Sequence, residues 1–195
     1  MNDNRFLLHV CCAPCAPHPL RTLKKQFALT LYFFNPNIHP KKEYQRRLDE
    51  TRTLAEMEGV GFIEGEYHPK EWLKKARQWK DEPEKGKRCE ACIGARLDET
   101  ARMAEELGIR RFGTVLTISR RKSSIMVNRM GSLAAKKFPG IAFSEADWKK
   151  AHGERFSEKI SAEYGFERQN YCGCVYSRIQ AREKEKRRAA ACVAK

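Results

Sequence analysis

The stretch RFLLHVCCAPC, residues 5–15, decides the fold of this 195-residue chain. Its first part, residues 5–10, is a short apolar run, which indicates a buried β-strand. The cysteines and the proline that follow end this strand, and helical patterns, the first of them at 20–27, then alternate with further strand-like runs at 28–34, 62–63 and 111–118. This alternation predicts an α/β fold, a Rossmann-like and mostly parallel sheet flanked by helices. The last third of the chain, from residue 142, is expected to be largely helical.

The chain is expected to form a single α/β domain over residues 1–195, with a basic C-terminal tail from about 181 to 195. No apolar stretch approaches the roughly 18–20 residues that a bilayer-spanning helix needs. The N-terminal apolar run ends at cysteines and not at a small-residue cleavage site, which disfavours a signal peptide. We therefore expect a cytoplasmic protein with no membrane partner.

The formal net charge is +14, from 39 lysines and arginines against 25 acidic residues. Such an excess is typical of proteins that bind nucleic acids, because basic side chains that contact phosphates release counterions. The basic residues are densest at 110–122 and 178–188. Candidates for phosphate contacts are Arg110, Arg111, Arg120, Arg121 and Lys122. The charge does not distinguish DNA from RNA.

Seven of the eight cysteines lie in short groups, and Cys192 stands alone. The groups are Cys11, Cys12 and Cys15, then Cys89 and Cys92, then Cys172 and Cys174. In a reducing compartment such groups indicate metal binding or redox chemistry. A zinc site would take the four thiolates of the last two groups, whereas a [4Fe–4S] cluster would take four and leave three for a second function. The residues alone leave both open.

The expected sheet brings several of these groups together, because ligands of parallel sheets bind beyond the carboxyl ends of the strands. Cys11, Cys12 and Cys15 follow the first strand, Asn35 and Asn37 the second, and residues 119–122 the fourth. The Cys172-Gly173-Cys174 spacing has its own consequence. A disulfide between positions i and i+2 closes a very small, strained ring, and strained disulfides are easily reduced and tend to be catalytic.

Motifs that occur in order from residue 9 to residue 174 identify a family. They are His9 to Cys15, Asn35 to Ile38 with Pro40, Glu43 and Tyr44, Cys89 and Cys92 with Arg96, Thr117 to Ser119, Asp147 to Lys150 with Gly153, and Arg168 to Cys174. This set resembles the cobalamin-independent epoxyqueuosine reductases of the QueH type. The segment 120–124 (RRKSS) departs from the family pattern.

The resemblance implies an oxidoreductase of tRNA processing that carries out the last step of queuosine biosynthesis. Its reaction is the two-electron deoxygenation of the epoxide of epoxyqueuosine in a tRNA anticodon, and an electron donor that the sequence does not identify would be a second partner. The resemblance also implies a [4Fe–4S] cluster, with a second iron ion beside it. Its ligands would be Cys11, Cys12, Cys89 and Cys92. The redox-active, catalytic pair would be Cys172 and Cys174, and Cys15 would neighbour the second metal.

The competing hypothesis is a non-catalytic, zinc-dependent nucleic-acid-binding protein that uses the same thiols and the same basic surface. A tRNA enzyme with an ATP-binding phosphate loop is disfavoured, because the position after the first strand holds Cys11-Cys12-Ala13-Pro14-Cys15 and no glycine-rich loop.

Overall fold

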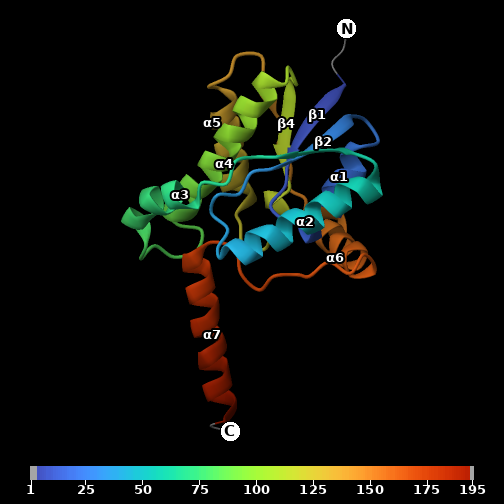
Figure 1. Cartoon of the computed structure of the whole chain (residues 1–195). Helices are drawn as coiled ribbons and strands as arrows, with labels where there is room; N and C mark the ends of the chain where they lie inside the picture. The colour runs from blue at the N-terminus through green and yellow to red at the C-terminus, as the bar shows by residue number, and fades with distance from the viewer. Residues whose placement is uncertain (1–3, 194–195) are drawn as a thin grey trace.

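The computed structural model describes residues 4–193, in which one sheet contains five parallel strands in the order β3-β2-β1-β4-β5 (Figure 1). The strands are β1 (Arg5–His9), β2 (Ala28–Phe33), β3 (Gly61–Glu64), β4 (Arg111–Thr114) and β5 (Ala142–Phe143). β1 is the central strand, since Leu7 pairs with Thr30 on one side and with Phe112 on the other. The predicted α/β fold with a parallel sheet is confirmed.

Helices flank this sheet on both sides (Figure 1). They are α1 (Pro17–Leu23), α2 (Lys41–Glu58), α3 (Pro69–Ala76), α4 (Lys87–Glu106), α5 (Ser124–Ala135), α6 (Gly153–Glu163) and α7 (Val175–Val193). α4 packs against α5 and against β1 and β4, whereas α2 contacts β2 and β3, and α6 packs on α1. α7 projects away from the body of the protein. The C-terminal region is helical, as expected.

The core forms where helices cover both faces of β1. Leu7 and Leu8 are fully buried, although they point to opposite faces of the sheet. On α4, Leu97, Ala101 and Ala104 occupy one buried face at helical spacing. Each fully buried leucine contributes roughly 1.5–3 kcal/mol relative to an exposed one. The core therefore holds the end of β1, and the residues that follow it, in a fixed place.

An ion-pair cluster joins three helices at one end of the sheet. Glu58, in the last turn of α2, accepts from Arg21 (2.7 Å) and Lys24 (2.5 Å) near α1. It also accepts from the hydroxyl of Tyr164, which follows α6. Burial alone would raise the pKa of Glu58, but the hydrogen bonds and charges of the two basic side chains hold that pKa below its usual value. This cluster couples the α6 segment to the body.

Several boundaries differ from the sequence-based expectation. The first helix was expected at 20–27 but begins at Pro17, because proline fits the first turn of a helix. The run 111–118 stays a strand only to Thr114 and then forms a turn of 3-10 helix, Leu116–Ile118. β5 was missed, because two residues are too short to show a periodicity.

The expected basic tail is helical in the part of it that the structure describes, because α7 extends to Val193. Residues 194–195 and the side chain of Cys192 lie outside the described part. Within residues 4–193 no helix combines the length and apolarity that crossing a bilayer requires. The single-domain organisation and the cytoplasmic location remain predictions.

Candidate active site

The candidate site lies where the strand order reverses. The chain moves from β1 to β2 on one side of the sheet and returns to β4 on the other, so the loops after β1 and β4 diverge and leave a crevice. A cavity of about 520 Å³ opens there, within the range of small-molecule sites. Cys11, Cys12 and Cys15 line it from one side, and residues 118–122 from the other. The predicted meeting of these two loops is confirmed.

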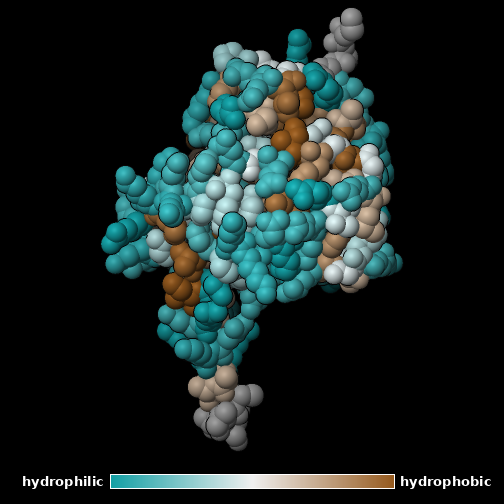
Figure 2. Space-filling view, viewed as in Figure 1, coloured by the Kyte–Doolittle hydropathy of each residue, from teal (hydrophilic) through white to brown (hydrophobic). Residues whose placement is uncertain are grey.

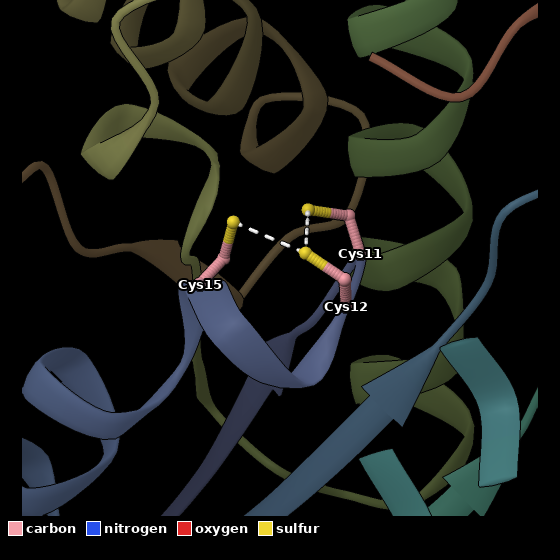
Figure 3. A group of neighbouring side chains, drawn as sticks. All are labelled: Cys11, Cys12 and Cys15. Carbon is pink, nitrogen blue, oxygen red and sulfur yellow. Dashed lines mark hydrogen bonds between the residues drawn. The ribbon is translucent and has the colours of Figure 1, made fainter. Parts of the chain in front are cut away.

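Three cysteine sulfurs meet at the end of β1 (Figure 3). The strand ends at His9, and a turn of 3-10 helix, Ala13–Cys15, then folds the chain back. The Sγ of Cys12 lies 3.1 Å from that of Cys15 and 3.9 Å from that of Cys11, and all three sulfurs lie within 4.8 Å of one another. Because the strand has already ended, Cys11 and Cys12 do not point to opposite faces. This geometry provides three sulfur ligands for a metal.

The other four grouped cysteines line a second, smaller cavity. Cys89 and Cys92 come from the first two turns of α4, and Cys172 and Cys174 come from the segment before α7. Cys172 lines both cavities, as does Lys122. Cys11 and Cys12 therefore lie with Cys15, whereas Cys89 and Cys92 lie with the predicted redox pair. The four predicted cluster ligands are thus divided between two adjoining cavities.

Two buried cations stand between these groups. Arg96 is 2% exposed and donates from Nε to the carbonyl of Cys92 (3.1 Å), and Lys122 is 9% exposed and donates from Nζ to the Sγ of Cys172 (3.1 Å). Among the described residues, neither forms a salt bridge with a carboxylate. A buried charge without an opposite charge is costly. Cys11 and Cys172, whose pKa values these two cations lower, provide the compensating negative charge.

The pKa shifts follow from this arrangement. Burial alone would raise the pKa of Cys172, but Lys122 and Arg96 lower it below the ordinary thiol value. Hydrogen bonds from Cys12 and Cys15 hold the pKa of Cys11 well below that value, while the pKa of Cys12 is raised well above it. Cys11 is thus the first of its group to ionise. Thiolates are the form of cysteine that binds metals and acts as a nucleophile.

The Cys172-Gly173-Cys174 segment is held by a buried arginine of α2 that the sequence analysis missed. Arg47 is 2% exposed, pairs with Glu43 (2.7 Å) and donates to the carbonyl oxygen of Cys172 (3.2 Å). Gly173 has a φ of +124°, and a Cβ there would lie 3.1 Å from Arg47 Nη1. Glu43 and Arg47 are four residues apart on one helix, and this spacing predicts an ion pair between them. Because such pairs usually lie on exposed helix surfaces, the spacing alone did not indicate that Arg47 is buried.

The two cysteines of this segment are free thiols with different partners. The Sγ of Cys172 accepts from Lys122, whereas the Sγ of Cys174 accepts from the backbone N–H of Ser177 (3.3 Å) in the first turn of α7. Both side chains still line the same cavity. The dithiol form of a redox pair fits this arrangement.

Other predicted residues have structural contacts. Asn35 donates from Nδ2 to the carbonyl of Val10 (2.9 Å) and so fixes the backbone in front of Cys11. Burial lowers the pKa of the nearby His9 to about 3, which keeps that imidazole neutral. Of the candidate phosphate contacts, Arg120, Arg121 and Lys122 line the large cavity. Arg110 and Arg111 lie at the start of β4, the opposite end of this strand from the crevice.

Comparisons with known proteins agree with this site. Residues 6–180 match the family model described as epoxyqueuosine reductase QueH. A protein of that name from Streptococcus pyogenes is 42% identical over 178 residues, which cover 88% of this chain and 69% of the relative. Another, from Histophilus somni, is 39% identical over 175 residues, covering 89% and 72%. A third, from Thermotoga maritima, is 36% identical over 181 residues, covering 91% and 92%. The chain therefore belongs to the epoxyqueuosine reductase QueH family.

Proposed function

We propose that this protein reduces the epoxide of epoxyqueuosine in a tRNA anticodon to the alkene of queuosine. The observation that carries the proposal is a crevice at the sheet switch point lined by cysteines and by the buried Arg96 and Lys122, which have no carboxylate partner in the described part of the chain. Thiols supply reducing equivalents, and the basic rim suits a phosphate-bearing substrate. Membership of the family supports this substrate.

A pair of cysteine thiols can supply the two electrons that the reaction consumes. Both C–O bonds of the epoxide break, a carbon–carbon π bond forms, and the oxygen leaves as water. The two electrons come from Cys172 and Cys174, which become a disulfide. The two protons come from the thiols, or from the Lys122 ammonium where Cys172 is already a thiolate. The external electron donor then returns the disulfide to the dithiol.

The neighbouring side chains prepare this pair. Lys122 stabilises the negative charge of Cys172, and the backbone N–H of Ser177 orients the Sγ of Cys174. Arg47 fixes the carbonyl of Cys172 and thereby the position of the segment. The positive φ of Gly173 turns the backbone between the two cysteines. These contacts bring both thiols to the wall of one cavity.

The remaining thiols fit an iron–sulfur centre. Arg96 interacts electrostatically with Cys92, Cys172, Cys11 and Cys89, so cysteines of all three groups surround one buried cation. We propose that Cys11, Cys12, Cys89 and Cys92 hold a [4Fe–4S] cluster and that Cys15 contacts a second iron ion. When bound, such a centre supplies single electrons and an iron that polarises the epoxide oxygen.

Metal analysis of protein purified without oxygen tests the ligand set. The wild-type protein is expected to contain iron and sulfide, and Cys89→Ala is expected to lose most of both. Cys192→Ser is the matched control, because this cysteine lies outside the three groups. Full iron content and full activity in Cys89→Ala would contradict the assignment. Stoichiometric zinc without iron, and no turnover, would favour the zinc-dependent nucleic-acid-binding protein.

A turnover experiment tests the redox pair. Pre-reduced enzyme is mixed with epoxyqueuosine-containing tRNA, and queuosine is measured after digestion. Cys172→Ser is expected to form no product through repeated turnovers, because one thiol cannot close the intramolecular disulfide. Repeated turnover by this variant at the wild-type rate would refute a role for the pair.

A further inference from the structure

α7 begins one residue after Cys174 and leaves the body of the protein (Figure 1). Its first turns pack on the rest of the protein: Ser177 is buried, and the ring of Tyr176 lies near Trp72 and the guanidinium of Arg88. Residues 182–190 are exposed. Figure 2 shows most of this projecting part as hydrophilic surface. The helix therefore extends the rim of the cysteine crevice into solvent.

α7 carries a strong excess of positive charge. Residues 178–188 contain six basic and two acidic side chains. Arg178, Arg182 and Lys186 follow one another at four-residue spacing, and so do Lys184 and Arg188. Like charges at this spacing destabilise a helix by a few tenths of a kcal/mol per pair, roughly 0.2–0.5. Within the described residues, no carboxylate forms a salt bridge with these five side chains. A polyanion would relieve this repulsion, whereas a second copy of the same helix would increase it.

One face of α7 continues the cysteine crevice. Lys184 lines the large cavity together with Arg121, and both also line a neighbouring groove of about 260 Å³. Arg188 lies one turn beyond Lys184 in that groove, about 6 Å further along the axis. The acidic groups in the groove already have partners: Glu84 pairs with Arg121 (3.3 Å), and Glu185 accepts from Asn170 (2.6 Å).

We propose that Arg121, Lys184 and Arg188 form a phosphate track that holds the backbone of the RNA strand leading into the crevice. The track itself reads no bases, because its three cationic side chains are suited to phosphate contacts. The inference rests on the proposed function, since the RNA strand is the one that carries the nucleotide to be reduced. It adds the element that holds this strand, which is a helix outside the sheet.

Two double variants of α7 test the track. Lys184→Gln/Arg188→Gln removes two charges from the groove face. Arg182→Gln/Lys186→Gln removes two charges at the same spacing from the opposite face of the same helix. Binding of a fluorescent anticodon stem-loop RNA is measured by anisotropy at several salt concentrations. For the track variant we expect the slope of log affinity against log salt to become less steep by about 1.4, since each phosphate contact accounts for about 0.7. The control is expected to keep the wild-type slope.

Kinetics separate this inference from the proposed function. With tRNA as substrate, the track variant is expected to raise KM while kcat stays near the wild-type value. With the isolated epoxyqueuosine nucleoside, all three proteins are expected to react alike. Hydrogen exchange in residues 182–190 is expected to slow when RNA binds wild-type protein. Equal slopes and equal KM values for the two double variants would overturn the track, and dimers formed through α7 would do the same. Absence of epoxide reduction by wild-type protein on either substrate would overturn the proposed function itself.

Discussion

Gly173→Ala is the most direct test of how the redox segment is held. Gly173 has a φ of +124°, which is far from the left-handed region near +57° that other residues tolerate. Its added Cβ would meet Arg47 Nη1 and Ile38 Cγ1 at 3.1 Å each. Both neighbours are at most 2% exposed, so a shift of either one disturbs buried contacts. The substitution therefore forces a shift of a few tenths of an ångström in these neighbours or in the backbone between Cys172 and Cys174.

The cost has two parts. A non-glycine residue in a sparsely populated backbone region costs about 1–3 kcal/mol. Overpacking a buried contact adds about 1–3 kcal/mol. Gly165→Ala is the matched control, because Gly165 also has a positive φ (+70°) but a Cβ there would meet nothing within 4 Å. The control is expected to lose only about 1–2 kcal/mol. The difference between the two variants is therefore about 2 kcal/mol.

Anaerobic urea unfolding measures this difference. At a typical slope of about 2 kcal/mol per M, Gly173→Ala is expected to unfold about 1 M earlier than Gly165→Ala. The same preparations are assayed for epoxide reduction, which Gly165→Ala is expected to retain and Gly173→Ala to lose. Equal unfolding midpoints together with retained turnover in Gly173→Ala would refute the reasoning.

Two further predictions concern the charged contacts. Arg47→Lys keeps the charge near Glu43 but loses the planar fork that reaches the carbonyl of Cys172, so turnover is expected to fall roughly 10- to 100-fold. Stopped-flow measurement of product formation checks this, and a wild-type rate would contradict it. Glu58→Gln is expected to cost about 1 kcal/mol at pH 7. Because the folded pKa of Glu58 is lowered, the difference from wild type should be constant above its ordinary pKa near 4.5 and vanish as the pH falls further. Urea midpoints from pH 8 down to pH 3 measure it, and a difference that does not begin to shrink as the pH falls below 4.5 would count against the ion pairs.

The sequence allowed prediction of the parallel sheet, because its strands are separated by helical patterns that leave few alternatives. The meeting of residues 11–15 with residues 119–122 also followed, since the carboxyl ends of parallel strands share one edge. β5 was not predictable from two residues, and the beginning of α1 was placed three residues late. Such boundaries depend on caps and on tertiary contacts that periodicity does not report.

Cysteine spacing by itself predicted that this chain has a thiol-rich centre, since seven of the eight cysteines lie in three short groups, which are typical of metal binding or redox chemistry. Only the tertiary structure decided how those thiols are grouped, with Cys15 beside Cys12 and with Cys89 and Cys92 beside Cys172 and Cys174. It also decided that Arg47, Arg96 and Lys122 are buried. The physical reason is that a local pattern records which face of a helix or strand is apolar, whereas the partner of a buried charge comes from distant segments.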